Sequence, residues 1–121
     1  MSAVPMAAGI ACIEKMKRLD LPRILNEQGR KLGDGLIEMG KKYSFDLRVT
    51  GAPSLFYLRI ADDSSMILHQ EWIAECVKRG VFFATHHNHF LNYAMTDEII
   101  AETLTVDEEA FYVVRKRHPL D

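Results

Sequence analysis

The amino-acid sequence predicts an α+β fold, in which helices cover one small, mostly antiparallel sheet. Apolar residues recur at helical spacing in four segments, whereas the shorter runs between them alternate or are continuously apolar, as in strands. Prolines, glycines and capping residues stand at the borders between these segments. The expected order of elements is therefore α-α-β-β-α-β-β-α.

Length and composition limit the number of domains that the chain can form. It has 121 residues and a mass of 13.8 kDa, with 48% apolar and 26% charged residues, as in one ordinary globular domain. No internal repeat or linker divides it, so residues 1–121 are predicted to form a single domain. This length excludes most complete cofactor enzymes of the large α/β classes, but it does not exclude a piece of one.

Charge, apolar run lengths and cysteine content limit the classes of partner and the cellular location that the sequence is compatible with. Fifteen Lys and Arg against 17 Asp and Glu give a net charge of −2, which argues against a nucleic-acid partner, because such binding depends on neutralising phosphates. No apolar run reaches the roughly 18–20 residues of a membrane span, and no basic segment marks a signal peptide. A cytoplasmic location is expected, with Cys12 and Cys76 as buried free thiols.

Two helices are predicted in the first third of the chain. Apolar residues repeat from Met6 to Met16, and the first helix should end near Asp20, because the residue before Pro22 is pushed away from helical angles. Asp20 is expected to cap the second helix, which runs to about Gly40. Glycines weaken a helix, so their density here indicates close packing against another element. These glycines are Gly29, Gly33 and Gly35.

The remaining elements follow from changes of period. A half-exposed strand and a more buried one form an antiparallel hairpin, and a helix containing Trp72 as a core residue follows. Two short strands and a last helix capped by Thr96 complete the chain. The predicted ranges are strands at 45–50 and 55–60, a helix at 67–77, strands at 81–83 and 90–94, and a helix from 97 to about 114.

A histidine cluster at Thr85-His86-His87-Asn88-His89 is the densest group of reactive side chains. If the stretch is extended, His87 and His89 project to one face at a spacing that some metal-binding strands use. No acidic residue or cysteine lies nearby to complete a ligand set, and no serine or cysteine nucleophile accompanies a histidine general base. A metal site, a catalytic histidine and a polar loop that lines a cleft therefore all stay open.

No other motif supplies catalytic chemistry. The glycines at 29–35 do not follow a strand, so neither a phosphate loop nor a dinucleotide fingerprint is indicated. Asp62-Asp63 suits a helix-capping turn better than a cation site. The lysines fall on exposed helical faces or ends, where nothing apolar would lower the pKa for Schiff-base chemistry. No catalytic site is therefore complete, and no residue is assigned a catalytic, cofactor-binding or metal-ligating role, with the histidine cluster kept as the alternative.

Several segments, taken in order, resemble a known family. The chain is similar over nearly its whole length to the C-terminal small domain of class III aminotransferases, which are fold type I pyridoxal-phosphate enzymes, and specifically to the glutamate-1-semialdehyde aminomutase-like branch. The segments that carry the resemblance are Pro5-Met6-Ala7-Ala8-Gly9-Ile10-Ala11-Cys12-Ile13-Glu14-Lys15, Leu21-Pro22-Arg23-Ile24-Leu25, Gly29-Arg30-Lys31-Leu32-Gly33-Asp34-Gly35-Leu36, Val49-Thr50-Gly51, Arg79-Gly80-Val81-Phe82-Phe83, His86-His87-Asn88-His89-Phe90 and Thr96-Asp97-Glu98.

The resemblance implies which parts of the enzyme lie elsewhere. In this family the lysine that forms the internal aldimine belongs to the large domain, so pyridoxal phosphate is expected in the parent and not on this chain alone. The small domain forms a wall of the substrate pocket, where amino-acid-specific relatives place an arginine on the substrate carboxylate. Asn92 stands at that position, and His86, His87 and Asn92 are expected to line the pocket. Ala94-Met95-Thr96 also departs from the Ala-His-Thr of this branch.

Three functional hypotheses follow. The first is a small domain whose parent transfers an amino group and which is inactive alone, with the large cofactor domain of the parent or of a second chain as its partner. The family's dimers imply a homo-oligomer, and the isolated domain should expose an apolar face. The second is a stand-alone α+β binding module with a metal or ligand at His86, His87 and His89. The third is a truncated gene product kept for its fold or for assembly.

Overall fold

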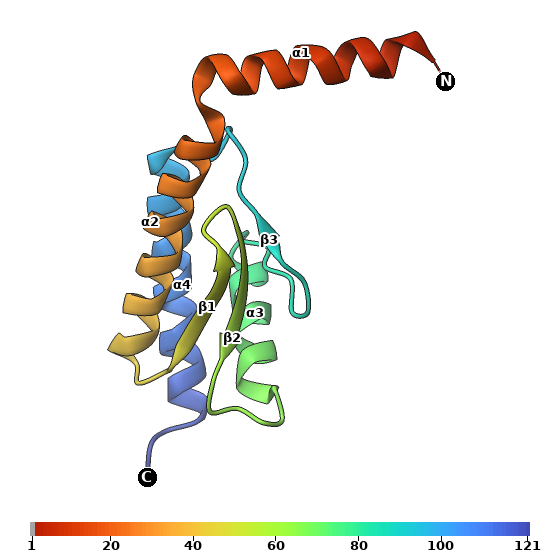
Figure 1. The fold of residues 1–121 in the computed structure, drawn as a ribbon. Helices are drawn as coiled ribbons and strands as arrows, with labels where there is room; N and C mark the ends of the chain where they lie inside the picture. The colour runs from red at the N-terminus through yellow and green to blue at the C-terminus, as the bar shows by residue number, and fades with distance from the viewer. Residues whose placement is uncertain (1) are drawn as a thin grey trace.

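The computed structural model describes residues 2–121 and confirms the α+β class (Figure 1). The structure contains four helices and a three-stranded antiparallel sheet of order β1-β2-β3. None of the helices in residues 2–121 has the length and apolar character needed to cross a membrane. The elements are α1 (Ala3–Leu19), α2 (Leu21–Lys42), β1 (Leu47–Ala52), β2 (Leu55–Ile60), α3 (Ile67–Lys78), β3 (His89–Phe90) and α4 (Asp97–Arg117).

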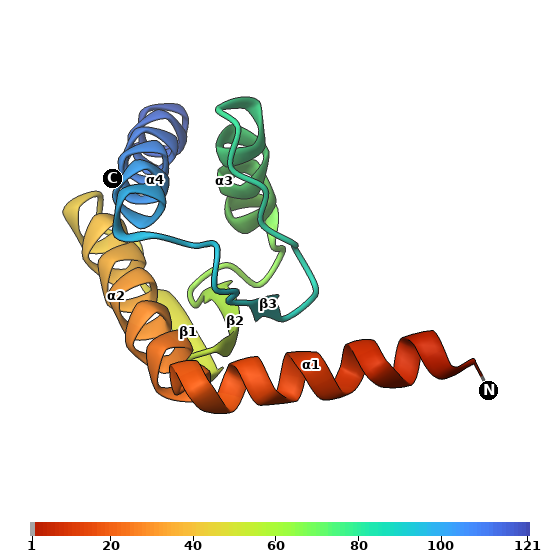
Figure 2. The same cartoon turned by 90° about the horizontal axis from the view of Figure 1, so that it is seen from above.

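The sheet is antiparallel throughout and packs helices α3 and α4 on one of its faces (Figure 2). Strand β1 pairs with β2 from Leu47↔Ile60 to Ala52↔Leu55, and β2 pairs with β3 at Phe56↔His89. Every second residue of β2 is buried, as the alternation of a one-sided sheet requires. Helices α3 and α4 lie on one side of the sheet, while α2 runs beside α4 and along β1 (Figure 2).

Two predicted strands differ from the structure. Residues 81–83 were expected to pair in the sheet, but within the described chain they form no ladder, and Val81 N–H bonds instead to the last turn of α3 at Cys76 O (3.0 Å). The strand expected at 90–94 shrinks to His89–Phe90, because the chain turns at Asn92, whose Oδ1 accepts from Ala94 N–H (3.0 Å). Asparagine favours such turns by bonding the backbone two residues on.

An aromatic stack forms the centre of the core. The Trp72 ring lies nearly parallel to Phe111, with centroids 5.0 Å apart, and stacks on Phe83 at 5.6 Å. Trp72 Nε1–H donates to Asp107 Oδ1 (2.7 Å), and both residues are fully buried, as expected for Trp72. Burial raises the pKa of Asp107 to about 8, so this carboxyl is protonated in the folded protein at neutral pH.

Close packing explains the glycines of α2. A Cβ on Gly29 would lie 1.8 Å from Pro53 O in the β1–β2 turn, and a Cβ on Gly35 would lie 2.6 Å from Leu104 Cδ1 of α4. The helix can approach the turn and α4 only because these side chains are absent. The predicted contact of this helix with other elements is confirmed.

Caps and bends follow the sequence in part. Thr96 Oγ1 accepts from Ile99 N–H (3.3 Å), which confirms the predicted cap of α4. Asp20 stands at the N-cap position of α2 in the left-handed conformation (φ 51°), but its side chain makes no capping bond and binds Arg23 Nε (2.7 Å) instead. The predicted capping bond is therefore wrong, although the helix boundary is confirmed.

Helix α1 projects away from the rest of the molecule (Figures 1 and 2). None of its residues is buried, and Ile10 and Ile13 expose 58% and 53% of their surface. Cys76 is buried as expected, but the prediction for Cys12 is wrong, because its helix meets only α2 and the loop that carries Tyr93, and Cys12 stays exposed. The apolar side chains of α1 are thus not covered by any other element among residues 2–121.

Candidate functional site

The segment between α3 and α4, residues 79–96, carries the predicted site residues. It leaves the end of α3, forms β3 at the edge of β2, and returns to the start of α4 (Figure 1). Residues 85–87 are bends rather than extended chain. The condition under which His87 and His89 would share one face is therefore not met.

His89 is turned inward and holds the loop closed. Its Nε2 accepts from Ala84 N–H (2.9 Å), and its ring stacks on Phe56 at 5.7 Å and meets the edge of Phe83 at 5.5 Å. Since Nε2 accepts, the proton of the neutral ring resides on Nδ1, which is buried and has no hydrogen-bond partner. Burial lowers the pKa of His89. A neutral imidazole therefore pins the base of the 84–89 loop.

His86 and His87 lie outside this core contact. Both are exposed, and His87 Nδ1 lies 3.1 Å from the neighbouring Asn88 carbonyl oxygen. Among residues 2–121, no three His, Cys, Asp or Glu side chains converge as a metal ion would require. The structure thus brings His89 to a packed position and leaves His86 and His87 at the surface, and nothing in this arrangement favours the metal-binding module.

Asn92 shapes the backbone at the end of β3. Its side-chain oxygen is engaged by Ala94 N–H, and the residue is exposed. The neighbouring Leu91 N–H donates to Ser54 O (3.0 Å), so the chain stays attached to the β1–β2 turn up to this point. Asn92 is therefore fixed at the place where the segment leaves the sheet.

A hollow of about 240 Å³ opens beside the loop, and the sequence did not point to most of its lining. Asn88 and His89 contribute its polar groups, whereas His86, His87 and Asn92 are not part of its wall. The signal available in the sequence was the pair Phe82-Phe83, of which only Phe83 is buried. The lining consists of Leu32, Phe56, Phe82, Phe83, Ala84, Asn88, His89, Phe90, Leu91 and Met95.

The residues present do not fit a covalent pyridoxal-phosphate site. Such a site needs a lysine amine held in surroundings that favour its neutral form. All the lysines of the chain are exposed, as predicted, and Lys31, Lys42 and Lys78 bind the carboxylates of Asp97, Glu108 and Glu75. The hydrogen bond to Glu108 raises the pKa of Lys42.

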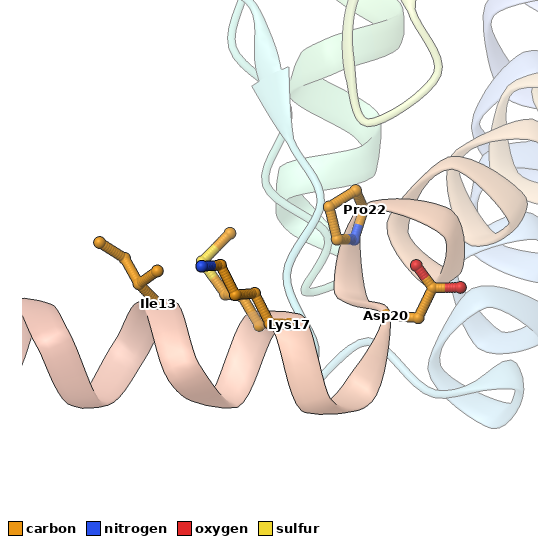
Figure 3. A pocket seen from close by; sticks show the side chains of 5 residues that line it. Ile13, Lys17, Asp20 and Pro22 are labelled. Atoms are coloured by element: carbon orange, nitrogen blue, oxygen red, sulfur yellow. The ribbon is translucent and has the colours of Figure 1, made fainter.

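Another hollow, of about 430 Å³, lies at the bend between α1 and α2 (Figure 3). Ile13, Met16, Lys17 and Pro22 line it together with Asp20. Figure 3 shows Ile13 and Lys17 on one face of α1, with Pro22 across the bend. This notch offers apolar surface and one amine but no group placed for acid–base chemistry, so it belongs to the uncovered surface of α1.

Comparison with known proteins shows which enzymes the chain resembles. No protein-family profile matches the chain. It is 33% identical over 113 residues to an aminopentol aminotransferase of Sphingopyxis macrogoltabida, spanning 93% of this chain and 27% of the relative. It is 28% identical over 120 residues to a glutamate-1-semialdehyde 2,1-aminomutase of Pyrobaculum neutrophilum, with 89% and 28% covered.

A solved structure shows the same architecture. The pyridoxal-phosphate internal aldimine form of the FumI protein of Sphingopyxis sp. MTA144 superposes with a TM-score of 0.91 and 32% identity. Nearly the whole chain is therefore similar to one part of pyridoxal-phosphate aminotransferases and aminomutases. The superposition covers 99% of this domain and 29% of the FumI chain, so the domain spans little more than a quarter of the relatives it matches. Both the family resemblance and the fold class expected from the sequence are confirmed.

Proposed function

We propose that this chain is the C-terminal small domain of a parent that transfers an amino group with pyridoxal phosphate, by transamination or as an aminomutase. The observation that carries the proposal is the superposition of nearly the whole chain on 29% of a pyridoxal-phosphate protein. Residues 1–121 are one unit of that parent. The cofactor is held by the remaining part, from the same or a second chain.

The isolated domain is inactive under this proposal. The exposed, ion-paired lysines support it, since none is placed to bind an aldehyde in a dry site. The exposed apolar stripe of α1 supports a missing partner, because a surface helix normally turns such a face to the core. We place the rest of the parent against α1 and propose that the assembled enzyme is a homo-oligomer.

The loop between α3 and α4 contributes to the substrate pocket in this proposal. His86 and His87 stand free on the loop that His89 closes, and Asn92 stands where the chain leaves β3. Asn92 offers an amide where an arginine would pair with a carboxylate, so the pocket favours amines without a carboxylate at that point.

A chimera tests this function. The domain replaces the matching segment of the Sphingopyxis macrogoltabida aminotransferase, with a segment-deleted enzyme as the control. We expect the chimera to retain pyridoxal phosphate as a visible aldimine and to transfer amino groups, whereas the purified 121-residue chain does neither. A folded chimera that retains cofactor but never transfers an amino group would contradict the proposal, as would activity of the isolated chain.

A further inference from the structure

We propose that the groove between the 81–84 and 88–95 segments binds the apolar, non-reacting part of the amine substrate. This inference rests on the proposed function, because the reacting amine would be held by the cofactor-bearing part of the parent. The substrate class that it assigns is amines with an extended hydrocarbon chain. The groove itself was not predicted from any sequence motif.

The groove is longer than one hollow. The hollow of about 240 Å³ adjoins a second of about 230 Å³, and the two share Leu32, Phe82, Phe83 and Met95. The second continues toward the start of α4 past Ile99, Ile100 and Thr103. Together they form a trough along the 81–84 segment, a shape that suits a linear chain better than a compact ring system.

The lining carries no charge. Neither hollow is lined by Asp, Glu, Lys or Arg. The one titratable group, His89, is neutral and has Nε2 engaged by Ala84 N–H. A carboxylate or phosphate placed here would lose its hydration without gaining an ion pair, which is strongly unfavourable. A hydrocarbon chain would lose only water that contacts apolar surface, which favours its binding.

Phe82 stands at the rim of the trough and lines both hollows. It exposes 80% of its surface, although the adjacent Phe83 is buried against Trp72. Phe83 and the His89–Ala84 bond fix the backbone on both sides of the trough, so the position of Phe82 at its rim is set by the core. The rim is therefore held in place before a ligand arrives, which reduces the entropy cost of binding.

Size favours a ligand over a protein. Each hollow is smaller than the roughly 300–1,000 Å³ of a complete small-molecule pocket, as expected of one wall of a shared site. A stable protein interface buries about 800 Å² on each side, which needs a broad surface and not a narrow trough. The uncovered helix α1, on the other hand, offers a long surface of the kind that a protein partner covers.

The test compares n-butylamine, n-hexylamine and n-octylamine as amino donors of the chimera. Each methylene buried in the trough contributes about 0.8 kcal/mol, so KM should fall about fourfold per added methylene while kcat changes little. Phe82→Asp should remove this dependence, so that KM no longer falls from butylamine to octylamine. Tyr112→Asp alters an exposed aromatic residue of α4 outside the trough and is the matched control.

An active chimera whose chain-length dependence is unaffected by Phe82→Asp would overturn the inference while the proposed function stands. If the chimera is inactive, the same amines are titrated into the 121-residue chain, and backbone amide shifts at Phe82, Phe83 and Met95 report binding. Shifts that grow with chain length and disappear in Phe82→Asp support the trough. No shifts, or shifts that depend on protein concentration because a second copy occupies it, overturn it.

Discussion

The body formed by α2, α3, α4 and the sheet buries its apolar side chains internally, whereas α1 buries none of its own. Trp72, Phe56 and Phe111 are fully covered in the body, and even the polar Asp107 finds a donor there. Ile10 and Ile13 of α1 carry the same kind of side chain but face outward. Apolar periodicity therefore predicts that a segment is helical, but not which molecule covers its apolar face.

A helix of this kind is stabilised by what packs on it. Isolated helices shorter than about 12–15 residues are marginal in water, and longer ones still gain most of their stability from tertiary contacts. The 17 residues of α1 contact the body only at α2 and the loop that carries Tyr93. The body should therefore unfold as one cooperative unit, while α1 should respond separately to its surroundings.

Substitution of Trp72 should cause the largest loss of stability in the body. Trp72→Ala removes the centre of the aromatic stack and the only hydrogen-bond donor of Asp107 in the described chain, and it should lower the free energy of unfolding by about 3–5 kcal/mol. Trp72→Phe keeps an aromatic ring but loses the N–H, and it should cost about 1–3 kcal/mol. Urea denaturation followed by circular dichroism checks both. Equal losses in the two variants would show that the hydrogen bond, not packing, dominates.

Two glycine-to-alanine substitutions, one in α2 and one in α1, compare the two regions directly. Gly29→Ala forces a Cβ against the backbone oxygen of Pro53 and should destabilise the body by about 1–3 kcal/mol. Gly9→Ala on α1 meets no atom within 4 Å and should only raise the helicity of α1, since alanine favours a helix by about 1 kcal/mol over glycine. Urea midpoints are measured for both. An equal loss of stability in Gly9→Ala would place α1 inside the cooperative unit.

The buried carboxyl of Asp107 makes stability depend on pH. Its pKa is raised from 3.8 to about 8 by burial, so between these values the unfolded chain is ionised while the folded chain holds a proton. The contribution to stability is therefore fully present below about pH 4, declines as pH rises, and is lost above about pH 8. Asp107→Asn keeps an acceptor for Trp72 and should remove this decline. Parallel pH profiles of wild type and variant would refute a raised pKa.

The smallest effect on the body should come from removing α1. Deletion of residues 2–18 takes away no buried side chain of the body, so the free energy of unfolding should change by no more than about 0.5 kcal/mol. The same deletion in the chimera should abolish cofactor retention, because α1 is the proposed contact with the rest of the enzyme. Thermal denaturation and aldimine absorbance report the two effects. A large loss of stability in the truncated domain would contradict the separation of the two regions.

Sequence patterns predicted the elements that depend on neighbours along the chain. The helix boundary near Asp20, the cap at Thr96 and the hairpin at 45–60 follow from local rules for proline, capping and alternation, and all are present. The buried position of Cys76 was predicted correctly for the same reason, because its helix has one clear apolar face. The exposure of Cys12 could not be predicted, since it depends on what lies against α1.

The candidate site was harder to predict from sequence than the helices and the hairpin, because loop geometry depends on contacts between residues far apart in sequence. His89 looks like His86 and His87 in the sequence, yet only His89 reaches Phe56 of β2 and closes the loop. The fourth predicted strand, 90–94, does not extend to Asn92, because the Asn92 side chain forms a turn there instead of the chain continuing to pair with β2. The trough beside Phe82 needs the meeting of α2, β2 and the loop, which no local pattern encodes.

Hydrogen–deuterium exchange of the 121-residue chain tests most directly whether the body is self-sufficient and α1 awaits a partner. We predict that amides of α4 near Phe111 and of β2 exchange only through global unfolding, whereas amides of residues 3–16 exchange close to the rates of an unprotected peptide. In the chimera, the α1 amides should become protected. Protection of α1 in the isolated chain equal to that of α4 would contradict this account.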